Sequence, residues 1–232
     1  MTNIEANISA RISTPSGEGE SHSEEFERIV EFLRENPHVF VAERARAAVE
    51  EAFDLGNILL VEVPNNGEFD IEGTAFVYDF LEESYIEIGT LNIPRLGGFD
   101  LQKLLVVLTA LRFLLRERSR PKAVFATFNK DNTRQYEKLT SAFMEPWNDP
   151  PEELREAKSH TIVHGAEHPI YFRFNEDFLP EACRYLLDML DCSAPLRRIN
   201  RHSRIHEILQ LSEIRHFVVR RMLDRVREIA GR

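Results

Sequence analysis

The segment that most constrains the fold is NIPRLGGFDLQKLL, residues 92–105, because it joins a strand to an apolar helix through a short glycine loop. The residues that lead into it, YIEIGTLNIP (85–94), are typical of a strand. The helix that follows, from Asp100 to about Arg118, is apolar around nearly its whole circumference. A helix of this kind lies against a sheet and is covered on its other sides as well. The pattern therefore predicts an α+β chain in which helices pack on a sheet.

Other segments have the periodicity of strands or helices. NILLVEV (57–63) and FDIEGTAFVYDF (69–80) flank the turn PNNG and form a predicted hairpin. KAVFATF (122–128) has no alternation, which indicates a buried central strand. The remaining expected elements are a strand through Ile4–Ile12, helices through Phe26–Leu33 and from about Ala42 to Phe53, a helix over 131–143, a strand over 168–174, and helices over Leu179–Leu190 and from Ser203 onward.

The charge of the chain is uneven. The net charge is −10, yet residues 197–232 hold ten arginines against four acidic residues, a net of +6, so the rest carries −16. We rank three interpretations of this basic segment: a solvated face of an amphipathic helix, then a segment that docks on its own acidic body or forms a homodimer, then a nucleic-acid grip. The third interpretation ranks last because Phe217 is the one aromatic residue that could interleave with the arginines.

Composition excludes several classes of protein. The longest apolar run, Leu104–Leu115, is interrupted by Thr109 and Arg112 and is too short to span a bilayer, so we expect no membrane partner. The two cysteines, Cys183 and Cys192, fit no metal spacing, and such sparse use is typical of a reducing interior. No apolar signal segment is visible near the start of the sequence. We therefore expect a cytoplasmic protein without a bound metal.

Three motifs, in this order, resemble those of the GNAT superfamily of acyl-CoA-dependent N-acyltransferases. GEFDIEGTAFVYDF (67–80) resembles the second hairpin of that family, and residues 85–105 resemble its fourth strand, pyrophosphate loop and following helix. VFATFNKDNTRQYEKLTSAF (124–143) resembles the fifth strand and fourth helix, with Asn129 and Tyr136 at the family's spacing of seven. The resemblance implies a GNAT-like mixed central sheet flanked by helices in residues 1–175, with residues 176–232 as a basic helical C-terminal extension.

The resemblance also implies where an acyl-CoA, most simply acetyl-CoA, would bind as co-substrate. In this family the fourth strand diverges from the fifth, and the pantetheine would pair with backbone groups of Leu91 and Ile93. Asn129 would bond the pantetheine or cap the next helix. The pyrophosphate would lie at the helix N-terminus, against the backbone amides of the preceding loop, which consists of Arg95, Leu96, Gly97, Gly98 and Phe99.

The loop departs from the family pattern at Asp100. The pattern requires a small residue there, whereas a carboxylate adds like charge beside a phosphate. The alternative role of Asp100 is a helix N-cap that accepts from the N–H groups of Gln102 or Lys103. A second departure is LTSAF (139–143), which lacks the family's glycine before phenylalanine and is two residues longer.

Two residues are the candidates for acid–base catalysis. Glu87 lies between Ile86 and Ile88 on a predicted central strand, and partial burial is expected to raise its pKa into the range of a general base. The alternative is a carboxylate that reaches solvent, and Asp79 and Glu83 are rival bases. Tyr136 matches the general acid that protonates the departing CoA thiolate, and its alternative is a packed aromatic residue.

The sequence therefore favours an N-acyltransferase that transfers an acyl group from acyl-CoA to a small-molecule or peptide amine by direct attack. Acidic residues such as Asp79, Glu82 and Glu83 point weakly to a cationic amine. Two alternatives remain open: a catalytically degraded GNAT-like module that serves in binding or scaffolding, and an acyltransferase that uses longer-chain or carrier-protein thioesters.

Overall fold

The structure is a computed structural model of the 232-residue chain. It describes residues 11–15, 22–37, 43–66, 68–82, 84–93, 99–116, 121–129, 144–164, 169–175, 177–190 and 223–231. Within these ranges, no helix is long and apolar enough to cross a membrane.

The centre of the fold is a seven-stranded sheet with the order β1-β3-β4-β5-β6-β9-β7. Every neighbouring pair is antiparallel except β5 and β6, which run parallel, so the sheet is mixed as the sequence predicts. A two-stranded sheet joins β2 to β8 beside it. The strands are β1 (Arg11–Ser13), β2 (Glu43–Arg44), β3 (Ile58–Asn65), β4 (Glu68–Phe80), β5 (Tyr85–Asn92), β6 (Ala123–Asn129), β7 (Met144–Pro146), β8 (Ile162–His164) and β9 (Pro169–Phe174).

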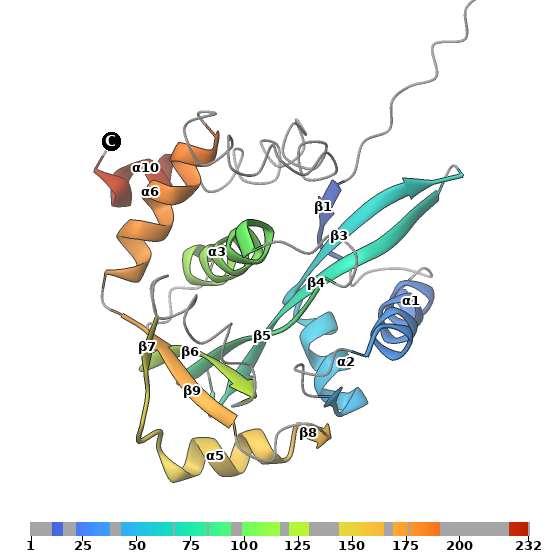
Figure 1. The fold of residues 1–232 in the computed structure, drawn as a ribbon, viewed down its shortest axis with the longest axis horizontal. Helices are drawn as coiled ribbons and strands as arrows, with labels where there is room; N and C mark the ends of the chain where they lie inside the picture. The colour runs from blue at the N-terminus through green and yellow to red at the C-terminus, as the bar shows by residue number, and fades with distance from the viewer. Residues whose placement is uncertain are drawn as a thin grey trace, which may run out of the picture.

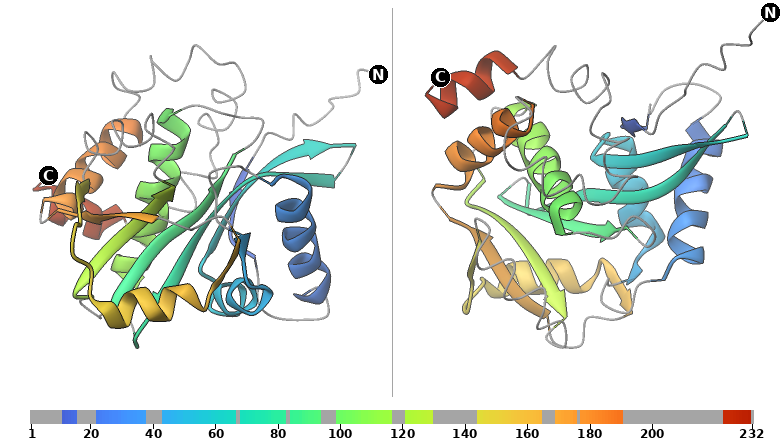
Figure 2. Two further views of the ribbon diagram at one scale, coloured as in Figure 1. Left: turned by 60° about the horizontal axis from the view of Figure 1, so that its bottom comes forward. Right: turned by 45° about the horizontal axis from the view of Figure 1, so that its top comes forward.

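Helices cover both faces of the large sheet (Figures 1 and 2). One face carries α1 (His22–Glu35), α2 (Arg46–Asp54) and α5 (Glu152–Ser159), and the other carries α3 (Phe99–Arg116), α6 (Phe178–Leu190) and α10 (Leu223–Ala230). The alternation of strand side chains produces these two cores. In β3, for example, Ile58 and Leu60 belong to the first core and Leu59 and Val61 to the second.

The parallel pair β5–β6 separates after three residues. Tyr85, Ile86 and Glu87 pair with Ala123, Val124 and Phe125, and β6 then continues along β9 rather than β5. This divergence is the feature that the resemblance to the GNAT superfamily predicts. The fold is therefore an α+β fold with a mixed central sheet flanked by helices, as expected.

Most elements appear where the sequence predicts them, with four exceptions. The second helix begins at Arg46 rather than near Ala42, because Glu43–Arg44 form β2 and Ala45 donates its N–H to the Thr161 carbonyl at 2.9 Å. The sequence also gave no indication of α5, β7 or β8. The expected helix over 131–143, the strand residues before Arg11 and the helical residues 203–222 lie outside the described residues.

The described parts of the C-terminal segment pack on the sheet domain. Phe178, Ala182, Leu186 and Leu187 of α6 and Val226 of α10 are buried in the same core as α3 and one face of the sheet. The described helix of the basic segment, α10, thus packs within the chain. The division at residues 175 and 176 and the homodimer remain predictions.

If α6 is part of this core, Leu186→Ala will lower the free energy of unfolding by about 2–5 kcal/mol, because Leu186 is fully buried and truncation leaves a cavity. Arg184→Ala, on the exposed face of the same helix, is the matched control and will change it by less than about 0.5 kcal/mol. Urea titration followed by circular dichroism measures both. Equal, small effects of the two substitutions would contradict the shared core.

Candidate active site

A bulge in β5 shapes the strand beyond the point of divergence. Phe76 of β4 pairs with Gly89, but Thr74 pairs with Asn92, so β5 has one extra residue between these pairs. Thr90 lies in this bulge with φ of 45°, a conformation that a β-branched residue rarely adopts. Two hydrogen bonds hold it: Thr74 Oγ1 donates to the Thr90 carbonyl at 3.1 Å, and the Tyr78 and Thr90 hydroxyls bond at 2.6 Å. Such strain persists where surrounding contacts enforce it, and it clusters at functional sites.

Gly89 permits a close approach beside this bulge. A Cβ at this position would lie 3.3 Å from the Tyr78 ring and 3.5 Å from Nη2 of Arg44. The guanidinium carbon of Arg44 in turn lies 4.4 Å from the centroid of that ring. Glycine therefore allows an aromatic ring and a guanidinium to stack directly over β5.

Glu87 lies at the last pair before β5 and β6 diverge, and its carboxylate holds two cations. Arg44 from β2 donates Nη2–H to Oε2 at 2.7 Å, and Lys158 from α5 forms an ion pair with Oε1. Thr127 of β6 also donates to Oε1, at 2.7 Å. The side chains of Glu87 and Lys158 are 1% exposed and that of Arg44 is 4% exposed, so all three charges lie in the interior.

The pKa of Glu87 moves in the direction opposite to the sequence-based expectation. Burial alone would raise this pKa, but the positive charges of Arg44 and Lys158 outweigh burial and lower the pKa to about 2. The expected rise is therefore wrong. The residues of a single strand favoured partial burial of Glu87. They gave no indication that two cations from other elements would contact its carboxylate.

Lys158 has the pKa nearest to neutrality in the cluster. Burial and the charge of Arg44 together lower this pKa to about 7, against the opposing attraction of Glu87. The physical reason is a charge imbalance, because two cations share one carboxylate. When Lys158 loses its proton, the buried cluster becomes neutral.

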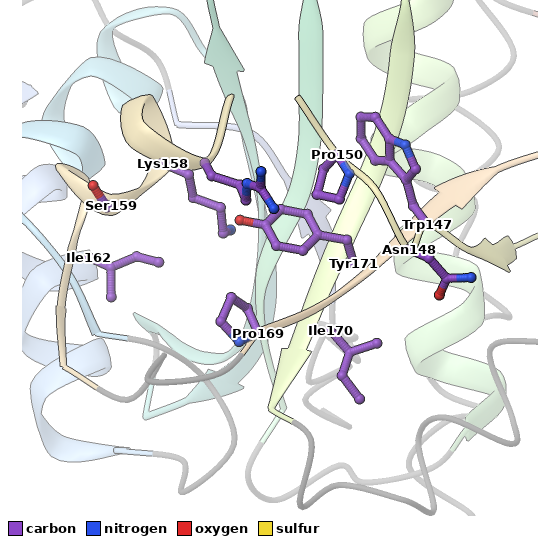
Figure 3. Close-up of a pocket in the computed structure, with 10 residues that line it drawn as sticks. Trp147, Asn148, Pro150, Lys158, Ser159, Ile162, Pro169, Ile170 and Tyr171 are labelled. Carbon is purple, nitrogen blue, oxygen red and sulfur yellow. The ribbon is translucent and has the colours of Figure 1, made fainter. Parts of the chain in front are cut away.

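A cavity of about 530 Å³ lies against this cluster (Figure 3). In this view, Lys158 of α5 and Tyr171 of β9 point toward the middle of the cavity, with Pro169 and Ile170 on one side and Trp147 and Pro150 on another. Its described lining consists of Trp147, Asn148, Pro150, Arg155, Lys158, Ser159, Ile162, Pro169, Ile170 and Tyr171. The volume is in the range of small-molecule sites.

The other expected site residues fall into two groups. Leu91 lies half-buried in the bulged part of β5 and Ile93 is buried directly after this strand, so both follow the point at which β5 and β6 diverge. Phe99 begins α3, and the backbone of Asn129 pairs with Pro169 at the end of β6. Arg95, Leu96, Gly97, Gly98 and Tyr136 lie outside the described residues. The roles of all these residues remain predictions.

Sequence reasoning missed Arg44 and Lys158. Both stand in short elements, β2 and α5, whose sequences gave no pattern of their own. One signal was present: Lys158 follows Leu154 by one helical turn, and both are buried on the same face of α5. Among the described residues, no group of three His, Cys, Asp or Glu side chains is placed to hold a metal ion.

Solved structures with similar folds include acetyltransferases. N-acetylglutamate synthase from Neisseria gonorrhoeae, complexed with coenzyme A and N-acetyl-glutamate, is 15% identical with a TM-score of 0.47; the match covers 71% of this chain but 35% of that one. Rv2747 from Mycobacterium tuberculosis, in complex with CoA, is 13% identical with a TM-score of 0.48 and coverages of 70% and 97%. Tetrahymena GCN5 is 9% identical with a TM-score of 0.43 and coverages of 72% and 97%.

This chain thus spans about a third of the synthase that it matches. No protein-family model matches the sequence, and no curated protein does. Identities and TM-scores this low carry no information about activity or site residues.

The charge imbalance predicts that two substitutions in the cluster will change the free energy of unfolding by very different amounts. Glu87→Gln leaves two buried cations without a carboxylate and will lower the free energy of unfolding by about 3–5 kcal/mol. Lys158→Met leaves the neutral Arg44–Glu87 pair and will change it by less than about 1 kcal/mol, or raise it. Urea unfolding at pH 7 measures both. A loss for Lys158→Met as large as that for Glu87→Gln would refute the imbalance.

The lowered pKa of Lys158 also predicts how stability depends on pH. Between about 7 and the ordinary value of 10.5, the unfolded chain keeps a proton on Lys158 that the folded chain has lost. The unfolded state then binds more protons, so this residue makes the free energy of unfolding rise with pH, by at most about 1.4 kcal/mol per unit. Below about pH 7 both states keep the proton, so Lys158 adds no pH dependence to the free energy of unfolding. Urea titration from pH 6 to 9 gives the free energies of unfolding of wild type and Lys158→Met, and the difference between them isolates this effect of Lys158. A difference that does not change with pH would rule the effect out.

Proposed function

We propose that this protein is an acyl-CoA-dependent N-acyltransferase, most simply an N-acetyltransferase. The observation that carries the proposal is the divergence of β5 from β6 directly after Glu87, with the Thr90 bulge on the diverging strand. A cavity of small-molecule size lies next to Lys158, the ion-pair partner of Glu87. Unpaired backbone groups on a strand edge bind an extended chain by β-augmentation. Pantetheine is such a chain, because it carries two amide groups.

The acyl donor is proposed to enter along this edge. The pantetheine would pair with the backbone of Leu91 and Ile93, and a backbone N–H of the same strand would polarise the thioester carbonyl as it becomes tetrahedral. The pyrophosphate would lie at the N-terminus of α3, against the loop that ends at Phe99. Asn129, at the end of β6, would bond the pantetheine from the other side of the opening.

The reaction is a direct acyl transfer. The neutral amine of the acceptor attacks the thioester carbon, a C–N bond forms, and the C–S bond breaks with release of the CoA thiolate. Tyr136 is the proposed donor of the proton that the thiolate takes up. The nitrogen loses its extra proton to solvent as the tetrahedral intermediate collapses, and the Tyr136 phenolate regains a proton from solvent, so the products are an amide and the CoA thiol.

The proposed role of Glu87 differs from that of a simple base. A carboxylate with a pKa of about 2 is a weak proton acceptor, so we propose that Glu87 acts by holding Arg44 and Lys158 in place beside the cavity.

One observation favours a different function. Asp100 stands in the first turn of α3, where the pyrophosphate would bind, and a carboxylate there competes for the helix N-terminus. A GNAT-type fold that no longer binds CoA would serve as a binding or scaffolding module. The choice between the two functions depends on CoA affinity, which can be measured directly.

Thermal unfolding with acetyl-CoA, longer acyl-CoAs and free CoA tests the proposal. A ligand at 100 times its Kd adds about 2.7 kcal/mol, which for a chain of this size raises Tm by roughly 5–10 °C. We expect such a shift for wild type, and we expect Tyr136→Phe to keep the shift while losing turnover of CoA thiol in a panel of amines. Absence of any shift for all CoA species in wild type would overturn the proposal.

A charge-matched pair of variants separates an enzyme from a degraded module. Asp100→Asn removes the carboxylate near the proposed pyrophosphate loop, and Asp70→Asn removes one on the exposed part of β4. If the loop binds pyrophosphate in spite of Asp100, Asp100→Asn will strengthen acetyl-CoA binding several-fold and Asp70→Asn will not. If acetyl-CoA shifts only the Asp100→Asn protein, the degraded module is the better description.

A further inference from the structure

When Lys158 is protonated, the buried cluster at Glu87 holds one positive charge in excess within the described part of the chain. Arg44 and Lys158 are both within ion-pair distance of the same carboxylate, and the neighbouring groups are the uncharged side chains of Thr127 and Thr161. Buried charges are normally paired, because an unpaired charge in the interior is costly. Something that balances this charge would therefore be expected where the cluster meets an opening.

The opening is the cavity that Lys158 lines. Its described lining contains a second cation, Arg155 on the exposed face of α5, and no Asp or Glu side chain. Of the acidic residues that the sequence suggested as contacts for a cationic amine, Asp79 and Glu82 are absent from the described lining, and Glu83 lies outside the described residues. The cavity is thus positive, although the chain as a whole carries −10.

The remaining lining is aromatic and apolar with a few donors. Trp147 and Tyr171 provide aromatic walls whose ring centroids are 6.5 Å apart, and Pro150, Pro169 and Ile170 close the sides. Asn148 and Ser159 add groups that can donate hydrogen bonds. A ligand that matches this lining has an anionic group for the cationic end and a small carbon skeleton for the walls.

We propose that this cavity binds the acyl acceptor, and that the acceptor is a small amine that also carries a carboxylate, as a free amino acid does. The carboxylate would pair with Lys158 and balance the excess charge of the cluster. The part of this inference that calls the ligand an acceptor rests on the proposed acyltransferase function. The binding of the carboxylate to Lys158 does not depend on that function.

The same charge arrangement would also prepare the amine for attack. After the ligand's carboxylate has paired with Lys158, the second cation of the lining, Arg155, still disfavours an ammonium group. It therefore lowers the pKa of the bound amine and increases the fraction in the neutral, nucleophilic form. The carboxylate supplies the binding energy that brings the amine into this environment. No strongly basic carboxylate is then required, in agreement with the low pKa of Glu87.

The chain contains its own reporter for this site, because Trp147 lines the cavity and is the single tryptophan of the sequence. The experiment titrates wild type with the free L-amino acids up to millimolar concentrations, in the absence of CoA, and follows tryptophan emission. Each acid that binds is compared with its α-carboxamide, which keeps the amine and lacks the carboxylate. We expect saturable binding of at least one amino acid, and binding of its amide weaker by roughly tenfold to a hundredfold.

Two lysine variants test whether Lys158 is the group that binds the carboxylate of the ligand. Lys158→Met is expected to weaken binding of the amino acid by a similar factor and to remove the preference for acid over amide. Lys122→Met, at an exposed lysine outside the cavity, is expected to leave both unchanged. Thermal unfolding confirms that each variant is folded, and the comparison of acid with amide on wild type needs no variant at all.

The outcomes separate this inference from the proposed function. Equal or tighter binding of the amides, no saturable binding by any amino acid, or an acid preference that survives Lys158→Met would overturn the inference. Turnover of acyl-CoA with amines that lack a carboxylate, and not with amino acids, would also overturn it while leaving the acyltransferase proposal intact. Carboxylate binding without any CoA binding would support the site and remove the acyltransferase function.

Discussion

The ion pairs of Glu87 are the interaction on which the site depends. The carboxylate stands on β5, and its partners come from β2 and α5, which are 43 and 71 residues away along the chain. A hydrogen bond from Thr127 connects β6 to the same group. One buried carboxylate therefore connects two central strands of the large sheet to the small β2–β8 sheet and to α5. The Glu87 carboxylate therefore helps to fix the elements that form the walls of the cavity.

The same residue marks the point at which the sheet opens. Glu87 occupies the last parallel pair between β5 and β6, and beyond it each strand has a different constraint. On β5 the constraint is the Thr90 bulge, which two hydrogen bonds from β4 enforce. On β6 it is continuous pairing with β9 up to Asn129. The pairing of β5 with β4 and of β6 with β9 thus maintains the divergence. The bulge at Thr90, with its positive φ, is stable because Thr74 and Tyr78 of β4 hold it.

The sequence predicted the large sheet well because its strands carry their own signals. The apolar and β-branched runs of β3 and β4, the PNNG turn between them and the unbroken apolar pattern of β6 are each visible within a few residues. It could not predict β2, β7 or β8, since strands of two or three residues are too short for any period to be visible. The short helix α5 was missed for a related reason, because most of its residues are charged and two of its eight are buried.

This limit had a direct consequence for the chemistry. Burial of Glu87 follows from its position between Ile86 and Ile88, and burial alone implies a raised pKa. The sign reverses because Arg44 and Lys158 reach the carboxylate from elements that leave no pattern in the sequence. A pKa is set by the charges within a few ångströms, so it depends on tertiary contacts more strongly than secondary structure does.

The electrostatic character of the cavity cannot be read from the composition. A chain with a net charge of −10 would be expected to attract cations, yet the described residues that line its cavity are positive or neutral. Net charge governs solubility and long-range association, whereas the field inside a small cavity comes from the few groups that face it in a medium of low dielectric constant. Lys158 can hold a positive charge there because Glu87 compensates it in part, and it is open to a second anion because Arg44 competes for the same carboxylate. This competition between two cations gives the interior of an acidic protein an affinity for a carboxylate.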